Sequence, residues 1–169
     1  MRMHEVYLSM GSNIGDRELN LRNSLKKLSS HVKLGRVSSL YESVAISEAP
    51  QDKYLNIAVK VSTQLNPNEL LRLLKEIEVS FGRNLEEKNM PRAMDIDIVF
   101  FDLLNVKQLD LEIPHPRSHL RAFVLMPLIE IDPNLIHPSL NKNLKDILID
   151  LEDQDIVKLN AINYWKAWM

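Results

Sequence analysis

The chain of 169 residues contains no cysteine. Disulfides, thiolate zinc sites and a cysteine nucleophile are therefore excluded. The net charge is also small: the chain has 21 Lys and Arg and 23 Asp and Glu, which gives a formal charge of -2. This balance argues against a nucleic-acid-binding surface over the whole molecule, although a local basic patch is compatible with it.

Long hydrophobic runs are missing as well. The N-terminal stretch Met1 to Val6 lacks the apolar core of a signal peptide, and no later run has the length of a membrane span. We therefore expect a cytoplasmic protein without a membrane partner. The sequence shows no internal repeat, low-complexity tract or linker, so we expect one domain over residues 1–169.

A glycine-rich phosphate loop is also absent, since GxxxxGK[ST] occurs nowhere. Gly11 to Asp16 follows an expected strand and precedes an expected helix, but this segment lacks the lysine of that motif. Its composition favours a simple strand-to-helix turn. Phosphate binding would then depend on other residues.

The hydrophobic pattern predicts the order strand, helix, strand, strand, helix, strand. The expected strands cover residues 5–10, 32–41, 54–63 and 95–101, and the expected helices cover 16–30 and 67–81. This order is typical of a ferredoxin-like βαββαβ sandwich of the α+β class, with helices on one face of an antiparallel sheet.

The C-terminal third is less regular and predicts an additional strand and helices. We expect a short strand over 109–113, a short helix over 119–128 bounded by Pro127, and a final helix over 144–151. Both tryptophans, Trp165 and Trp168, lie in the tail, for which we expect a packed C-terminal segment.

Two carboxylates, Asp95 and Asp97, alternate with Ile96 and Ile98 in the last strand of the βαββαβ unit. Because side chains alternate across a strand, the two acids share one face and the apolar residues share the other. Adjacent carboxylates favour a proton or a cation, and magnesium prefers such oxygens. A solvated polar strand face is the alternative, and the strand alone does not decide between them.

Basic side chains near this strand suit phosphate oxygens. Arg83, Lys88 and Arg92 precede this strand, and a cluster that includes His115 follows it. The other members of that cluster are Arg117, His119 and Arg121. An acidic pair for magnesium and arginines for phosphate together are typical of phosphoryl transfer.

Tyr54 and Asn56 share a strand face and, with Phe123, could line a second small-molecule pocket. Aromatic rings stack on flat heterocycles, and an amide reads a polar edge. Each residue taken alone is equally compatible with a core or surface position.

Several motifs follow one another along the chain: Gly11-Ser12-Asn13-Ile14-Gly15-Asp16, Ser38-Ser39-Leu40-Tyr41-Glu42, Tyr54-Leu55-Asn56, Pro91-Arg92-Ala93-Met94-Asp95-Ile96-Asp97-Ile98, Pro114-His115-Pro116-Arg117, Arg121-Ala122-Phe123-Val124-Leu125 and Pro127-Leu128. In this order and spacing the chain resembles 6-hydroxymethyl-7,8-dihydropterin pyrophosphokinase of folate biosynthesis, over about residues 6–138.

This resemblance implies a magnesium-dependent transferase that passes pyrophosphate from ATP to the pterin hydroxymethyl group and releases AMP. It implies two Mg²⁺ ions held by Asp95 and Asp97, and catalytic roles for Arg83 and Arg92 beside a mobile loop. The implied ATP-binding residues are Glu78, Ile98, His115 and Arg121. The implied pterin-binding residues are Ser43, Val44, Ile46, Tyr54, Asn56 and Phe123. ATP and the pterin are the expected partners of a monomer.

The chain departs from the family pattern in the loop before the acidic strand. Asn89-Met90 stands where family members commonly have Trp-Gly, and Leu85 replaces a frequent second arginine. These departures motivate one alternative, a catalytically impaired relative that binds pterin and ATP. Fold and acidic pair alone allow another, a palm-type nucleotidyl transferase.

Overall fold

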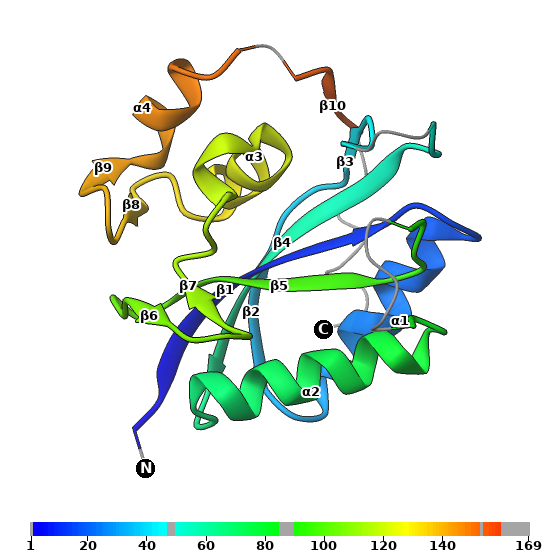
Figure 1. Ribbon diagram of the computed structural model, residues 1–169, viewed down its shortest axis with the longest axis horizontal. Coiled ribbons are helices and arrows are strands. Elements are labelled where there is room, and N and C mark those ends of the chain that lie inside the picture. The colour runs from blue at the N-terminus through cyan, green and yellow to red at the C-terminus, as the bar shows by residue number, and fades with distance from the viewer. Residues whose placement is uncertain (1, 47–49, 85–89, 153, 160–169) are drawn as a thin grey trace.

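The computed structural model describes residues 2–46, 50–84, 90–152 and 154–159. Its first part contains β1 (His4–Ser12), α1 (Arg17–Ser29), β2 (Lys33–Val37), β3 (Tyr41–Ser43), β4 (Tyr54–Thr63), α2 (Pro67–Ser80) and β5 (Asp95–Phe101) (Figure 1). Its second part contains β6 (Val106–Lys107), β7 (Glu112–Ile113), the 3₁₀ helix η1 (Ser118–Leu120), α3 (Ala122–Ile131), β8 (Ile136–His137), β9 (Lys142–Asn143), α4 (Leu144–Ile149) and β10 (Ile156–Lys158).

Local side chains set where the first two helices begin. Asp16 caps α1 by accepting from Leu19 N at 3.0 Å. Asn66 caps α2 in a reciprocal capping box with Glu69, and Pro67 occupies the first turn, where no N–H is needed. Both helix starts therefore confirm the prediction from the sequence.

The main sheet is antiparallel in every pairing, with the order β10, β3, β4, β1, β5, and β2 also pairs with β4. The ferredoxin-like prediction is confirmed. The single strand expected over 32–41 is wrong, because the chain leaves the sheet after Val37 and re-enters at Tyr41. The two pieces pair with opposite ends of β4.

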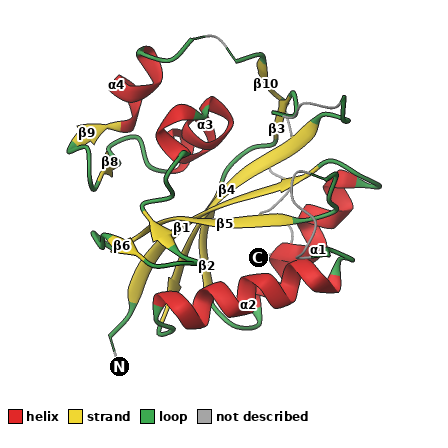
Figure 2. Cartoon of the chain, viewed as in Figure 1, coloured by secondary structure: helices red, strands yellow, loops and turns green. Residues whose placement is uncertain are grey.

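Helices cover both faces of this sheet (Figures 1 and 2). α1 and α2 bury Leu21 and Leu74 against Val6 and Ile96 on one face. On the opposite face α3 and α4 pack a second cluster, which includes Leu125. The expectation of helices on one face holds for α1 and α2, and the C-terminal helices add the second layer.

The C-terminal third differs most from the predictions. α3 continues through Pro127 to Ile131, because its apolar side chains pack in the second core and outweigh the missing proline N–H. Only Glu112–Ile113 of the strand expected over 109–113 is in a strand, and β10 was not predicted. Trp165 and Trp168 lie outside the described residues. No helix among the described ranges is long and apolar enough to cross a membrane.

Candidate functional site

Asp95 and Asp97 lie on the face of β5 predicted from the strand period. Ile96 and Ile98 between and after them are buried, whereas the Asp95 and Asp97 side chains keep 28% and 35% of their surface exposed. In the neighbouring strand β1, Gly11 stands opposite Asp95 and Ser9 opposite Asp97. The sheet therefore fixes both carboxylates over a small-residue floor.

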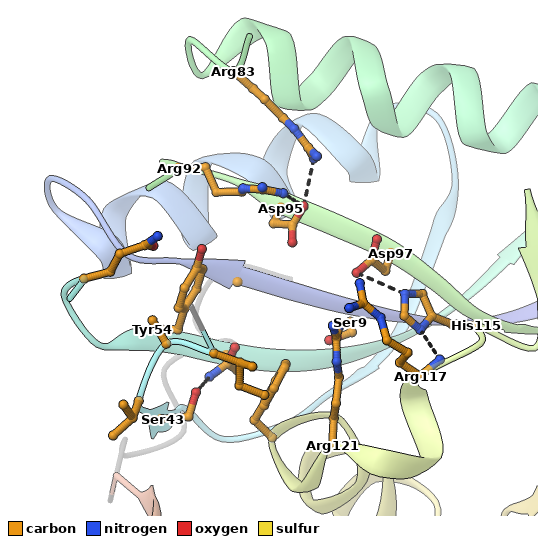
Figure 3. Close-up of a pocket in the computed structure, with 17 residues that line it drawn as sticks. Ser9, Ser43, Tyr54, Arg83, Arg92, Asp95, Asp97, His115, Arg117 and Arg121 are labelled. Carbon is orange, nitrogen blue, oxygen red and sulfur yellow. Dashed lines mark hydrogen bonds and ion pairs between the residues drawn. The ribbon is translucent and has the colours of Figure 1, made fainter. Parts of the chain in front are cut away.

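The two acids open into a cavity of about 390 Å³ at the end of the sheet beside α3 (Figure 3). Its wall combines β1, β4 and β5 with the segment that leads into α3. The lining residues are Ser9, Gly11, Ser43, Val44, Ala45, Ile46, Gln51, Tyr54, Asn56, Arg83, Arg92, Asp95, Asp97, His115, Arg117, Arg121 and Phe123.

Two arginines bind the first carboxylate. Arg83 Nη1 lies 2.8 Å and Arg92 Nη1 lies 2.9 Å from the same oxygen, Asp95 Oδ1. Burial alone would raise the pKa of Asp95, but the charges of Arg92 and Arg83 outweigh it and lower the pKa. Asp95 is therefore ionised at neutral pH.

Glu78 stabilises the position of Arg83 beside Asp95. It is fully buried, accepts from Ile96 N at 2.7 Å, and lies 2.5 Å from Arg83 Nη1. Lys75 Nζ binds its other oxygen at 2.9 Å. Burial raises the pKa of Glu78, and the neighbouring cations oppose that effect. Glu78 thus ties the end of α2 and Arg83 to β5.

Asp97 is in a different electrostatic environment. Burial and the charge of Asp95 raise its pKa, and the basic group in contact with it, His115 Nε2, lies 3.8 Å from Oδ2. Burial lowers the pKa of His115, so its imidazole is largely neutral at pH 7. Asp97 is therefore less well compensated than Asp95, as expected for a carboxylate that receives a cation.

Arg117 and Arg121 face this acidic corner (Figure 3). Burial lowers the pKa of Arg121, and the charge of Arg117 lowers it further. No ion pair with an acidic side chain is found for either arginine within the described part of the chain. Two adjacent guanidinium groups of this kind suit the oxygens of a polyphosphate.

The other end of the cavity is aromatic and amide-lined. Asn56 is 3% exposed and donates from Nδ2 to Ser43 Oγ at 2.9 Å, so its carbonyl oxygen is directed elsewhere. That oxygen lies close to Gly11, where a Cβ would approach it to 3.2 Å and the Tyr54 ring to 3.3 Å. Gly11 therefore leaves room in front of both side chains.

Apolar groups complete this end. Phe123 lies under the Arg121 guanidinium, with 5.5 Å between Arg121 Cζ and the ring centroid. Val44 and Ile46 line the cavity while remaining 50% and 71% exposed. An aromatic ring, a buried amide and exposed aliphatic side chains together suit a flat, polar-edged heterocycle.

The corner formed by Asp95 and Asp97 suits a magnesium ion that is shared between the protein and a phosphate ligand. Within the described ranges no group of three or more His, Asp or Glu side chains could hold a metal ion alone. Magnesium commonly takes one or two carboxylates and completes its shell with water and substrate phosphates. Asp95 and Asp97 supply the carboxylates, and the adjacent cations favour phosphate.

The structure brings most of the predicted residues into one cavity. These are Ser43, Val44, Ile46, Tyr54, Asn56, Arg83, Arg92, Asp95, Asp97, His115, Arg121 and Phe123. Glu78 and Ile98 lie buried on the opposite side of β5 and do not line it. His119 lines a separate cavity and faces His137, with 5.7 Å between ring centroids.

The loop departures lie mainly outside the described residues. Leu85, Lys88 and Asn89 belong to the range 85–89. Met90 is 53% exposed and does not line the cavity that holds Asp95 and Asp97.

Several residues that line the cavity were not predicted from the sequence, although some of them had a recognisable sequence signal. Ser9 lies opposite Asp97 because the antiparallel register pairs β1 with β5, which strand order alone does not give. Gln51 and Ala45 lie between the strands expected over 32–41 and 54–63, where no periodicity indicates the direction of a side chain. Arg117 was in the basic cluster without an assigned role.

Comparisons with known proteins identify the family of the chain. The family model described as 7,8-dihydro-6-hydroxymethylpterin-pyrophosphokinase (HPPK) matches residues 7–133. The "2-amino-4-hydroxy-6-hydroxymethyldihydropteridine pyrophosphokinase" of Bacillus subtilis is 45% identical over 75% of this chain and 77% of its own length. The "Folic acid synthesis protein FOL1" of Dictyostelium discoideum is 46% identical over 80% of this chain and 21% of its own.

A solved structure shares the fold. The wild-type HPPK-DHPS of Plasmodium falciparum superposes with a TM-score of 0.71 at 18% identity, over 88% of this chain and 44% of that one. The chain thus spans about a fifth of the Dictyostelium protein and under half of the Plasmodium one. Since the family model covers more than half of the residues, the chain belongs to the 7,8-dihydro-6-hydroxymethylpterin-pyrophosphokinase family.

Proposed function

We propose that this chain transfers a pyrophosphoryl group from ATP to 6-hydroxymethyl-7,8-dihydropterin, a step of folate biosynthesis. The observation that carries the proposal is one cavity that joins an acidic pair, two arginines without an acidic partner among the described residues, and an aromatic, amide-lined end. Membership of the pyrophosphokinase family supports the same reaction.

The triphosphate occupies the charged end. Arg121 and His115 bind phosphate oxygens, and Arg83 and Arg92 stabilise charge that develops during transfer. Both catalytic arginines already lie within 2.9 Å of Asp95. Glu78 acts through Arg83, because its own carboxylate is fully buried. A direct contact of Glu78 or Ile98 with ATP stays a prediction.

The pterin occupies the aromatic end between Tyr54 and Phe123, with Asn56 reading its polar edge. Ser43, Val44 and Ile46 close that side of the ring. The hydroxymethyl oxygen forms a bond to the β-phosphorus, the bond from that phosphorus to the α,β-bridging oxygen breaks, and AMP leaves with that oxygen. The hydroxyl proton is released, so the products are AMP, the pterin diphosphate and a proton.

Asp95 and Asp97 would hold two Mg²⁺ ions together with the triphosphate. When bound, magnesium neutralises phosphate charge and orients the reacting groups. The less compensated charge of Asp97 supports this assignment. The proposal also includes a monomer acting as a single cytoplasmic domain, which sedimentation and cell fractionation can test.

Product analysis tests the reaction. Incubation with ATP, magnesium and the hydroxymethyl-dihydropterin is expected to give AMP and pterin diphosphate in equal amounts. ADP with a pterin monophosphate would instead show an ordinary kinase. Binding of both substrates without turnover would show the impaired relative. Family membership leaves the palm-type nucleotidyl transferase without support.

A further inference from the structure

Asn13 is a buried residue that contacts two walls of the cavity without lining it. It follows β1, is 1% exposed, and belongs to the turn for which only a connecting role was expected. Its amide and main chain make hydrogen bonds to two other segments of the chain. This arrangement distinguishes it from an ordinary turn residue.

The first contact is with the backbone of Arg92, whose N–H and C=O groups both bind Asn13. Asn13 N donates to Arg92 O at 3.1 Å, and Asn13 Oδ1 accepts from Arg92 N at 2.8 Å. Arg92 carries the guanidinium that binds Asp95 at 2.9 Å. One residue therefore satisfies both main-chain polar groups of a catalytic arginine, which fixes where its side chain starts.

The second contact reaches the pterin side. Asn13 Nδ2 donates to Gln51 Oε1 at 3.1 Å and to Asp52 O at 3.3 Å. Gln51 lines the cavity three residues before the start of β4 at Tyr54. The amide orientation is consistent throughout, because its oxygen meets a donor and its nitrogen meets two acceptors.

We infer that Asn13 is a positioning residue that couples Arg92 at the phosphate end to Gln51 at the pterin end and so sets the alignment of the two substrates. This inference rests on the proposed function. Replacing Asn13 removes no group that touches either substrate. The expected loss is therefore in the transfer step more than in binding.

Asn13→Ala is the first test, with Asn20→Ala as its matched control. Asn20 also uses its amide within this turn, donating to Ser12 Oγ at 3.2 Å and Ile14 O at 3.0 Å, and contacts neither Arg92 nor Gln51 in these bonds. We expect Asn13→Ala to lower kcat by ~10- to 100-fold, the scale of a small misplacement of reacting groups, with KM for ATP changed less than ~3-fold. Asn20→Ala should change kcat less than ~3-fold.

A double-mutant cycle with Arg92→Ala separates positioning from general loss of structure. In the Arg92→Ala background, Asn13→Ala should lower kcat by less than ~3-fold, because the guanidinium that Asn13 positions is already gone. Multiplicative losses in the double variant, or equal losses in Asn13→Ala and Asn20→Ala, would overturn the inference.

Hydrogen exchange of the Arg92 amide can be measured even in variants of low activity, and Asn13→Asp is a conservative variant for the same test. The Arg92 amide should be protected from hydrogen exchange in the wild type and unprotected in Asn13→Ala. Asn13→Asp keeps the acceptor and should restore both protection and at least ~5-fold of kcat over Asn13→Ala. If Asn13→Ala does not fold, unprotected Arg92 in Asn13→Asp would contradict the inference. A wild type that makes no AMP would refute the proposed reaction, whereas the exchange result would still judge the contact.

Discussion

Replacing Asp97 by Asn should stabilise the metal-free protein while it abolishes transfer. Asp97 and Asp95 lie two residues apart on one strand face, so their carboxylates are about 7 Å apart. Two like charges at that distance repel by about 2.4 kcal/mol at an effective dielectric constant of 20, and by about 0.6 kcal/mol in water.

Solvent reduces the larger figure, because 35% of the Asp97 side chain is exposed. We therefore expect a net gain of about 1 kcal/mol, which raises Tm by about 2–4 °C for a chain of this size. The pKa of Asp97 is raised by burial and by Asp95, so its ionisation destabilises the fold as pH rises through that pKa. The advantage of Asp97→Asn should accordingly grow from pH 4 to pH 7.

The assay is calorimetry in EDTA, with Asp102→Asn as a control of opposite sign. Burial would raise the pKa of Asp102, but its bonds to His4 and Glu5 N outweigh it and lower the pKa. Asp102→Asn should lower Tm. With magnesium and both substrates, Asp97→Asn should lose at least ~10³-fold in kcat, about 4 kcal/mol of transition-state stabilisation. A lower Tm for Asp97→Asn, or near-normal turnover, would refute this reasoning.

Three further substitutions test the supporting contacts. Arg92→Ala should lower kcat more than ATP affinity in steady-state and equilibrium-binding assays, and an unchanged kcat with weaker binding would limit Arg92 to ground-state binding. Glu78→Gln removes the charge that faces Arg83 and should cost about 3 kcal/mol, or about 6–12 °C in Tm by calorimetry, while an unchanged Tm would contradict a supporting role. Burial would raise the pKa of Glu130, but the hydrogen bond from Tyr41 outweighs it and lowers the pKa. Glu130→Gln should therefore cost about 1 kcal/mol at pH 7 in denaturant titrations, and this gap should close toward pH 3, whereas a gap that widens in acid would be incompatible with that pKa.

The sequence was sufficient to predict features that depend on local periodicity or on helix caps. The strand period placed Asp95 and Asp97 on one face, and the caps Asp16 and Asn66 located two helix starts. These features depend on neighbours a few residues away, which a sequence displays directly.

Features set by long-range packing were not accessible in this way. Pro127 indicated a helix end, but the apolar second core carries α3 through it. The role of Asn13 depends on residues 38 and 79 positions away, which no periodicity brings together. Arg83 could be assigned to the site by resemblance, but its pairing with Glu78 required the fold.

The most direct test of the account follows the oxygen that attacks ATP. The pterin is labelled with ¹⁸O in its hydroxymethyl group and converted with magnesium and ATP, and the products are examined by ³¹P NMR. The account predicts that the label bridges the pterin carbon and the proximal phosphorus of the diphosphate, with unlabelled AMP in equal amount. Label in AMP, loss of label from the product, or ADP as the nucleotide product would contradict pyrophosphoryl transfer at the Asp95 and Asp97 site.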